Sequence, residues 1–553
     1  MARMRFFAKG VMASVRRARW WILAATVLCA VDQVIRMSVF SPGFPRASVL
    51  HTARLFLFYV PLTIVPAFCL GRGARFVAPV FFCFWVLVEA LQLWVSRSFN
   101  MVLGGNWVLM AFSTSGAELR EFTAGFATVG GVACLVCALA AAAAVAWFFA
   151  GRRREWPPFS SASAFVAAVC IAFSCWMAPK CFRSPVSWAQ ISRDLLALNF
   201  PVDTLTNWRA YRNLAVACRE EPPFDLGLKT CGGQPPLCVF VIGESTTRNH
   251  MGIYGYRRNT TPELEAIRAE GGLAVFTDLE ATHISTPEAL CSLFTGCDLA
   301  SGQRLSAVFP ALLKKAGYET TLVSCQGSWQ NRDVVGTHLF MSCGSRKFLQ
   351  DGRVAGTLPD GVALPEVENA LKGRSGPLAL FVHLYGCHNP ATRRVPEGFV
   401  REWPPASDVS TEKARRKQDS YDTAVAYDDF IVASIIRMVA AQGAPACVFF
   451  VSDHGESPSS PIWRDAKSRD TFEVPLVVWL SPEYRKAFPE TVERVAASTD
   501  KKLFMNQLLE GMLELAGVTG YGDADGCGNF LSPNFRHKGP DTKKEDLQSG
   551  KSH

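Results

Sequence analysis

An aspartate and a histidine follow one another at the end of an apolar run of the sequence. The run, Cys447–Val451, is rich in branched and aromatic residues and leads through Ser452 to Asp453 and His454. Such a run predicts a strand buried on both faces, and open α/β sheets carry their sites at the carboxyl ends of their strands. A carboxylate oxygen and a ring nitrogen there suit a zinc ion. The pair alone is equally compatible with a turn in which Asp453 caps a helix.

A second apolar run has the same kind of ending. Leu237–Ile242 is followed by Gly243 and Glu244, which again predicts a buried strand closed by an acid. Two such strands in one parallel sheet would place three ligands, Glu244, Asp453 and His454, at one edge. Together they predict a metal site that neither strand predicts alone.

Thr286 is the candidate nucleophile. Pro287 follows it and Glu288 comes next, a pattern typical of a helix start with Thr286 as the cap and Pro287 at the first helical position. A hydroxyl there faces unpaired backbone N–H groups and the positive end of the helix dipole, which suit a phosphate. Metal coordination would lower its pKa. The helix start alone also accounts for Thr286, and Ser285 is the rival hydroxyl.

Two histidines accompany a third apolar run. His383 ends the predicted strand Leu378–His383, and we interpret it as a core histidine. His388 follows Gly386 in the next loop, so we expect it to contact a ligand or a phosphate. Proton donation to a leaving alkoxide is a second role open to it.

These residues belong to a region in which apolar strands alternate with helical stretches. Such alternation predicts an α/β domain with a mainly parallel sheet flanked by helices, which we place at residues 231–539. A polar tail, 540–553, is predicted to be disordered. The predicted segments are Leu237–Ile242, Glu263–Glu270, Leu290–Thr295, Ala307–Ala316, Thr320–Ser324, Leu378–His383, Tyr421–Ala441, Val448–Ser452 and Leu476–Leu480.

The first 179 residues have a different composition. Of the 553 residues, 49% are hydrophobic, and the apolar excess lies in this part. We predict five membrane-spanning helices of near the ~20 residues that a bilayer requires, joined to the α/β domain by an interfacial arm, 180–230. Arginine and lysine gather before the first span and in alternate loops, which places the N-terminus inside and the α/β domain outside. The predicted spans are Trp20–Val39, Leu55–Leu70, Phe76–Val95, Phe122–Ala150 and Ala162–Met177.

Thr114 and Glu118 lie in the outer loop between the third and fourth predicted spans. Their spacing of four residues puts them on one face if the segment is helical. A carboxylate at the membrane surface could bind an ammonium headgroup, although a helix start with Thr114 as its cap fits the spacing equally well.

Charge and cysteine usage agree with an exported domain. The net charge of +9 is partly a topology signal and shows no nucleic-acid footprint, and we interpret the basic cluster 413–417 as a solvated helix face. Eleven of the 18 cysteines follow residue 180, where disulfides can form. The preferred pairs are Cys231 with Cys238, Cys291 with Cys297, and Cys325 with Cys343, leaving Cys447 as a buried thiol.

As a set, these motifs resemble the membrane-anchored phosphoethanolamine transferases of Gram-negative bacteria, in the sulfatase and alkaline-phosphatase superfamily. The matching parts are Ile242–Arg248, Gly255-Tyr256, Thr260–Leu264, His383 with His388, Ser452–Ser457 and the five-span anchor.

The resemblance implies a monomeric inner-membrane enzyme with its catalytic domain in the periplasm. It implies zinc bound by Glu244, Thr286, Asp453 and His454, with Thr286 carrying phosphoethanolamine as a covalent intermediate. His388 would contact the phosphate, and the loop with Thr114 and Glu118 would bind the headgroup of phosphatidylethanolamine, the donor. The acceptor would be an envelope glycan or glycolipid, with lipid A or lipopolysaccharide core favoured over glucan and protein glycan.

Three alternatives remain open on the sequence. A sulfatase would need Cys or Ser followed by x-Pro-x-Arg, which Thr286-Pro287 does not provide. A phosphoglycerol transferase of the lipoteichoic-acid type would share the fold and the anchor. A non-catalytic membrane sensor is the third, because the stretch 468–475 has no histidine where relatives usually place one. Asp470 is a candidate substitute.

Overall fold

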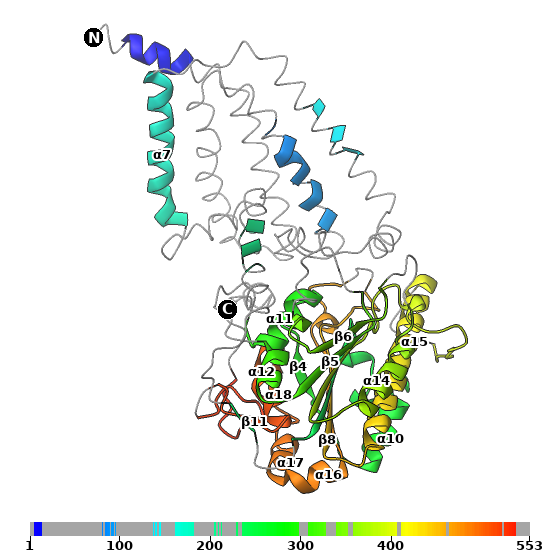
Figure 1. The fold of residues 1–553 in the computed structure, drawn as a ribbon. Coiled ribbons are helices and arrows are strands. Elements are labelled where there is room, and N and C mark those ends of the chain that lie inside the picture. Colours follow the sequence, from blue (N-terminus) through cyan, green and yellow to red (C-terminus); the bar gives the residue numbers. More distant parts are fainter. Residues whose placement is uncertain are drawn as a thin grey trace. The chain divides into compact units, whose positions relative to one another are not determined.

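The computed structural model describes most of the C-terminal part of the chain and only short stretches before residue 230 (Figure 1). The chain divides into two units near residue 206. The described residues of the C-terminal part are 235–297, 308–327, 339–351, 358–405, 411–460, 464–522 and 525–537; those before it are 5–13, 161–181, 228–230 and parts of 80–95, 136–144 and 204–212.

In the N-terminal unit the best described element is the helix α7, Ser161–Cys181, which coincides with the predicted fifth span. The first, second and most of the fourth predicted spans lie outside the described residues, as do Thr114 and Glu118. None of the helices described is at once long enough and apolar enough to cross a membrane.

The C-terminal unit is built on a seven-stranded sheet with the order β3-β9-β8-β2-β7-β5-β6. Neighbouring strands from β8 to β6 are parallel, whereas β9 is antiparallel to both β8 and β3. The predicted α/β class is therefore confirmed, with a mixed sheet. The strands are β3 Leu273–Val275, β9 Leu476–Leu480, β8 Ala446–Ser452, β2 Leu237–Gly243, β7 Leu378–His383, β5 Glu319–Ser324 and β6 Ser345–Phe348.

Helices cover both faces of this sheet (Figure 1). One face packs against α11, α12 and α18, and the other against α10, α14 and α15. Because the central strands are covered on both sides, every residue of β2, β7 and β8 is buried, which is why these strands are continuously apolar in the sequence. The helices are α10 Pro262–Glu270, α11 Thr286–Thr295, α12 Phe309–Lys315, α14 Leu364–Lys372, α15 Glu412–Ala440 and α18 Leu509–Leu515.

Smaller elements complete the unit. Two further helices follow β9, and two pairs of short strands lie outside the large sheet: β10 is parallel to β4, and β1 is antiparallel to β11. These elements are α16 Pro482–Ala487, α17 Pro489–Ala496, β4 Asp278–Glu280, β10 Lys502–Phe504, β1 Lys229–Thr230 and β11 Val518–Thr519.

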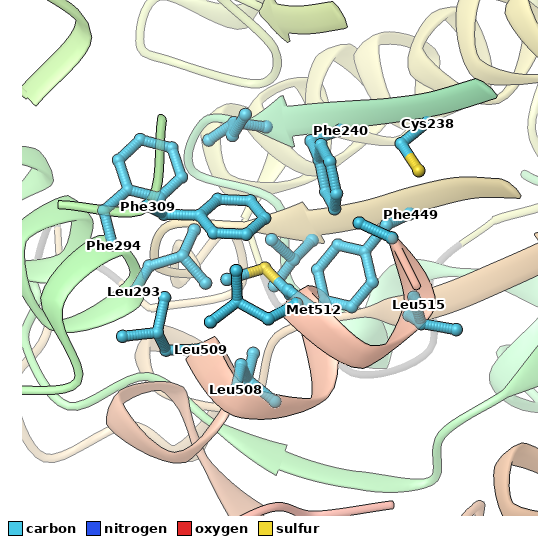
Figure 2. Packing of buried hydrophobic residues seen from close by; sticks show 14 of the residues in the cluster. Cys238, Phe240, Leu293, Phe294, Phe309, Phe449, Leu508, Leu509, Met512 and Leu515 are labelled. Atoms are coloured by element: carbon cyan, nitrogen blue, oxygen red, sulfur yellow. The ribbon is translucent and has the colours of Figure 1, made fainter. Parts of the chain in front are cut away.

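Aromatic rings fill the core on the α11 side of the sheet (Figure 2). Phe240 of β2 meets Phe309 edge-on with 4.8 Å between ring centroids, and it stacks on Phe381 of β7 at 5.5 Å. Phe449 of β8 lies 6.1 Å away. Contacts of this kind add to the free energy of burying each ring, so the middle of the strands fixes the sheet on which the polar strand ends are placed.

Among the cysteines that the structure describes, the expected disulfides are not formed. Cys325 and Cys343 are separate thiols, because Cys325 packs in the core on one face of the sheet and Cys343 in the core on the other. No bond joins Cys291 to Cys297 either, and the buried Cys238 lies beside the hydroxyl of Tyr318, at 4.0 Å. Cys231 lies outside the described residues. Cys447 is a buried thiol, as predicted.

The basic cluster at the start of α15 is only partly a solvated face. Lys413, Arg415 and Arg416 are exposed, but Lys417 turns inward. Its ammonium group donates to the carbonyl oxygens of Ser457 and Ser460 at 3.0 and 3.1 Å. The interpretation of 413–417 was therefore wrong for Lys417, which fastens the loop that follows β8.

Candidate metal centre

The two strand ends singled out in the sequence lie next to one another. β2 and β8 are parallel neighbours, and Gly243 pairs with Ser452 in the last register of the two strands. The next residues, Glu244 and Asp453, therefore emerge side by side. Ligand atoms of Glu244, Asp453 and His454 all lie within 4.8 Å of one another, and all three residues are buried.

Hydrogen bonds orient these three side chains. The Glu244 carboxylate accepts from the Ser245 hydroxyl at 2.7 Å, and Asp453 Oδ1 accepts from the backbone N–H groups of Ser245 and His454 at 3.1 and 2.7 Å. Nδ1 of His454 lies 2.9 Å from the carbonyl oxygen of Gly455. Since that carbonyl can only accept, we assign a proton to Nδ1, so that Nε2, which faces the carboxylates, is the ring nitrogen that can release its proton and bind a metal ion.

The arrangement fits a bound zinc ion. Oδ2 of Asp453 is buried and has no hydrogen-bond partner among the described residues, and an orphaned buried acceptor of this kind needs a ligand. Nε2 of His454 lies 3.3 Å from Glu244 and 3.5 Å from Asp453 Oδ2. Two carboxylates and a neutral imidazole with an inward lone pair are a donor set that zinc accepts.

Charges within the cluster shift its pKa values in opposite directions. Burial on its own would raise the pKa of Glu244, but the hydrogen bond and charge of His454, with the charge of Arg464, lower it well below the usual range. Burial and the Glu244 charge raise the pKa of Asp453 to about 7. Burial lowers the pKa of His454, yet the two carboxylates outweigh burial and raise it. The two buried carboxylates thus compete for the same positive charge, and a metal cation bound between them would favour the ionised form of both.

Thr286 reaches this cluster from α11. Its hydroxyl donates to Glu244 Oε2 at 2.9 Å and lies 3.5 Å from Nε2 of His454. The rival Ser285 turns away, because its hydroxyl donates to Glu288 at 2.7 Å. The helix also starts one position earlier than predicted: Ser285, with an extended backbone, holds the cap position, and Thr286 is the first helical residue.

His388 is held by a loop that packs tightly on the end of β2. Gly386 adopts a φ of +52°, and a Cβ there would lie 2.5 Å from the carbonyl oxygen of Glu244. The buried carboxylate of Asp360 accepts the N–H groups of Tyr385 and Gly386, both at 2.8 Å. A residue other than glycine at 386 would push the loop away from Glu244.

The imidazole of His388 is neutral at pH 7. Nδ1 lies 2.8 Å from the carbonyl oxygen of Asn389, so Nε2 carries the lone pair. Burial lowers the pKa of His388 to about 3, against the opposing charge of Glu244. A neutral ring with that tautomer accepts a hydrogen bond or binds a cation, and it is a poor proton donor to an alkoxide.

His383 is a buried strand residue, as expected. It pairs with Ile242 in the sheet and its ring packs against Phe340. Burial lowers its pKa to about 4. Asp470, the candidate substitute for the missing histidine, is not part of the metal cluster and accepts a hydrogen bond from Asn249 at 2.8 Å.

Two residues of the site were missed by the sequence analysis. Arg464 lies 3.5 Å from Glu244 Oε1, and the side-chain amide of Gln326 donates to Glu244 Oε2 at 3.4 Å. Gln326 follows the predicted strand Thr320–Ser324, so the rule that located Glu244 and Asp453 would also have found it. Arg464 stands in no motif, and nothing in the sequence marks it.

Comparisons with known proteins agree with this geometry. The sulfatase family model matches residues 236–518. Among curated proteins, the chain is 27% identical over 333 residues to phosphoethanolamine transferase EptC of Escherichia coli, covering 57% of this chain and 56% of that protein. It is 28% identical over 316 residues to Kdo(2)-lipid A phosphoethanolamine 7''-transferase of Salmonella typhimurium, covering 55% and 53%. The chain thus spans about half the length of the curated relatives it matches.

Two solved structures are similar. The C-terminal periplasmic domain of E. coli EptC in complex with Zn is 26% identical, with a TM-score of 0.52, and covers 57% of this chain and 93% of that one. The match to the integral membrane protein lipooligosaccharide phosphoethanolamine transferase A of Neisseria meningitidis covers 92% of this chain and 96% of that one, with a TM-score of 0.62. At 18% identity, this second likeness concerns the fold alone.

Proposed function

The chain belongs to the sulfatase family, and from that premise we propose that it is a zinc-dependent phosphoethanolamine transferase. The observation that carries the proposal is the contact of the Thr286 hydroxyl with the Glu244 carboxylate, beside His454. A hydroxyl at the first residue of a helix, next to a cluster of metal ligands, is placed to act as a nucleophile toward phosphorus. The names of the similar proteins supply the group transferred.

The proposed reaction has two steps. In the first, Thr286 Oγ1 attacks the phosphorus of phosphatidylethanolamine, the new P–Oγ1 bond forms, and the bond from phosphorus to the glycerol oxygen breaks. Diacylglycerol leaves with that electron pair and takes up a proton from solvent. In the second, an acceptor oxygen attacks the same phosphorus and loses its proton to solvent, the P–Oγ1 bond breaks, and Oγ1 takes up a proton from solvent, which regenerates the threonine hydroxyl.

The residues of this chain have separate tasks in that reaction. Oε2 of Glu244, 2.9 Å away, accepts a hydrogen bond from the Thr286 hydroxyl and so orients Oγ1, whose proton passes to solvent during the attack. Glu244, Thr286, Asp453 and His454 would hold zinc, which when bound supplies positive charge at the phosphate and lowers the pKa of the hydroxyl. Nε2 of His388, neutral and carrying a lone pair, is placed to accept a hydrogen bond from the substrate.

The substrates and the location are also part of the proposal. We infer that the donor is phosphatidylethanolamine and that the acceptor is an envelope glycolipid, with lipid A or lipopolysaccharide core as the favoured acceptor. The names of the similar proteins support this inference, because one refers to Kdo(2)-lipid A and another to a periplasmic domain. We propose a monomer anchored in the inner membrane with a periplasmic catalytic domain. Thr114 and Glu118 would bind the ammonium headgroup.

Mass spectrometry of lipopolysaccharide and glycans from cells with and without the protein tests this function. Wild type should add a ~123 Da phosphoethanolamine increment, and Thr286→Ala should abolish it because the nucleophile is lost. Ser285→Ala is the matched control and should retain the increment, since the Ser285 hydroxyl faces Glu288. An increment that survives in Thr286→Ala but disappears in Ser285→Ala would assign the nucleophile to Ser285 instead.

A further inference from the structure

Arg464 is a charged side chain that enters the metal centre from the loop after β8. Its side chain is 13% exposed, and Nη2 lies 3.5 Å from Glu244 Oε1 and 3.4 Å from the hydroxyl of Ser245. Nη1 lies 3.5 Å from the carbonyl oxygen of Ile284, two residues before Thr286. The guanidinium group therefore spans the gap between the end of β2 and the start of α11.

The backbone of Arg464 is strained in this position. The residue adopts a φ of +46°, a conformation that side chains other than glycine rarely take. Its N–H donates to the buried Glu456 carboxylate at 2.8 Å, which fixes the turn. Lys417, bonded to Ser457 and Ser460, fastens the same loop from α15. Strain that neighbouring contacts maintain beside a cluster of reactive groups points to function.

Contacts within the protein do not use the full donor capacity of this side chain. Its contacts to Glu244, Ser245 and Ile284 are long, at 3.4–3.5 Å. Nε is buried and has no hydrogen-bond partner among the described residues, and the carboxylate of Glu456 is 3.9 Å from it. A guanidinium fork with five donors is suited to two oxygens of one phosphate, so a phosphate in the gap would complete the set.

The position of Arg464 relative to Thr286 decides which phosphate this would be. The Thr286 hydroxyl contacts one oxygen of the Glu244 carboxylate, Oε2, and Arg464 contacts the other, Oε1. Nucleophile and guanidinium thus flank a single carboxylate. Phosphoryl transfer places negative charge on the non-bridging oxygens in the transition state, where an arginine stabilises it.

We propose that Arg464 binds the non-bridging oxygens of the phosphoryl group that Thr286 receives, and supplies the second positive charge of a site with one zinc ion. The proposal rests on the transfer function proposed above. The described residues contain one cluster of three candidate metal ligands, and Arg464 brings a fixed positive charge to the Oε1 side of Glu244. Asp470 and Glu473, which occupy the histidine-free stretch, bond to Asn249 instead.

The test compares four proteins, each as the full chain in detergent. They are the wild type, Arg464→Ala, Arg464→Lys and, as a control, Arg437→Ala. Arg437 forms an exposed ion pair with Glu263. Zinc per chain is measured by atomic emission, binding of inorganic phosphate to the zinc-loaded protein by calorimetry, and transfer by labelled headgroup. We expect one zinc in every protein, at least tenfold weaker phosphate binding in Arg464→Ala, and ~100-fold lower kcat/KM, as for loss of one transition-state donor. Guanidinium chloride should restore part of that activity, and lysine should retain part of it.

Each contrary result overturns the proposal. Two zinc ions per wild-type chain would remove the need for a second fixed charge. Zinc loss in Arg464→Ala that matches its loss of activity would make Arg464 a residue that assembles the ligands. Unchanged phosphate binding in Arg464→Ala would exclude the contact. Phosphate binding does not depend on turnover, so a wild-type protein that transfers no phosphoethanolamine would refute the proposed function, while calorimetry would still decide whether Arg464 binds phosphate.

Discussion

The middle and the carboxyl end of the same strands are both buried, but they are built from opposite kinds of residue. In the middle, Phe240 and Phe449 pack among aromatic rings on one face of the sheet. A few residues further along, Glu244 and Asp453 are as fully buried but are surrounded by polar and charged groups. Burial alone therefore does not distinguish structure from function in this protein. What distinguishes them is whether each buried group finds its partners within the chain.

The two regions differ in how their stability arises. The middle of the strands is stabilised by many dispersion contacts between closely packed apolar atoms, each of which is weak on its own. At the strand ends the partners are few, and charges shift pKa values in both directions, down for Glu244 and up for Asp453. Such opposed shifts are typical of sites that bind cations or perform catalysis. Mutations in the two regions should therefore separate stability from transfer.

Phe240→Ala should give the largest effect, and it should be on stability. Removing a buried ring among Phe309, Phe381 and Phe449 leaves a cavity, which should lower the free energy of unfolding by about 3–5 kcal/mol. Denaturant titration followed by tryptophan fluorescence measures this change. Phe240→Leu should lose roughly 1.5 kcal/mol or less. Zinc content and transfer per folded molecule should remain unchanged in both, and a selective loss of transfer would refute the separation of the two regions.

That separation also explains what the sequence could predict. Runs such as Leu237–Ile242 and Val448–Ser452 identify themselves, because a strand buried on both faces must be apolar throughout. The clustering of their polar endings was predictable as well, because neighbouring parallel strands end at the same edge of the sheet. Thr286 was found through its helix start, with an error of one position in the cap.

Other features depend on the folded chain and had no local signal. Arg464 enters the site only because a turn with positive φ and a bond to Glu456 point it there. The predicted pairing of Cys325 with Cys343 failed because spacing along the chain does not reveal that the sheet lies between them.

Asp360→Asn should give the next effect, shared between stability and transfer. The carboxylate accepts two backbone N–H groups of the loop that carries His388, whereas an amide oxygen paired with an NH₂ group satisfies only one of them. We expect a loss of about 2 kcal/mol in the free energy of unfolding. Transfer should fall roughly tenfold, because a displaced His388 no longer positions the substrate for attack by Thr286. Zinc content should not change.

Asp429→Asn is the matched control for that variant. Asp429 is also a buried carboxylate that accepts two backbone N–H groups, those of Glu263 and Leu264 at 2.9 Å, but it caps α10 away from the strand ends. It should lose similar stability and keep its transfer rate. Equal loss of transfer in both variants would show that Asp360 acts through stability alone.

The smallest effect, about tenfold per pH unit, should appear in the zinc affinity. Burial and Glu244 raise the pKa of Asp453 to about 7, so below pH 7 the metal-free protein holds a proton there that zinc must displace. The affinity for zinc should therefore fall as the pH is lowered from 7, by about tenfold per unit for that one proton. The pKa of His454 is also raised, so a proton on its ring, which zinc must displace as well, should steepen the fall. Above pH 7 the contribution of Asp453 should level off. Competition with a chromogenic chelator between pH 5.5 and 8.5 measures the slope, and Phe240→Leu should follow the wild-type curve because neither side chain titrates. An affinity independent of pH across that range would mean that Asp453 is already ionised without zinc, and that the strand ends are less strained by their buried charge than their geometry implies.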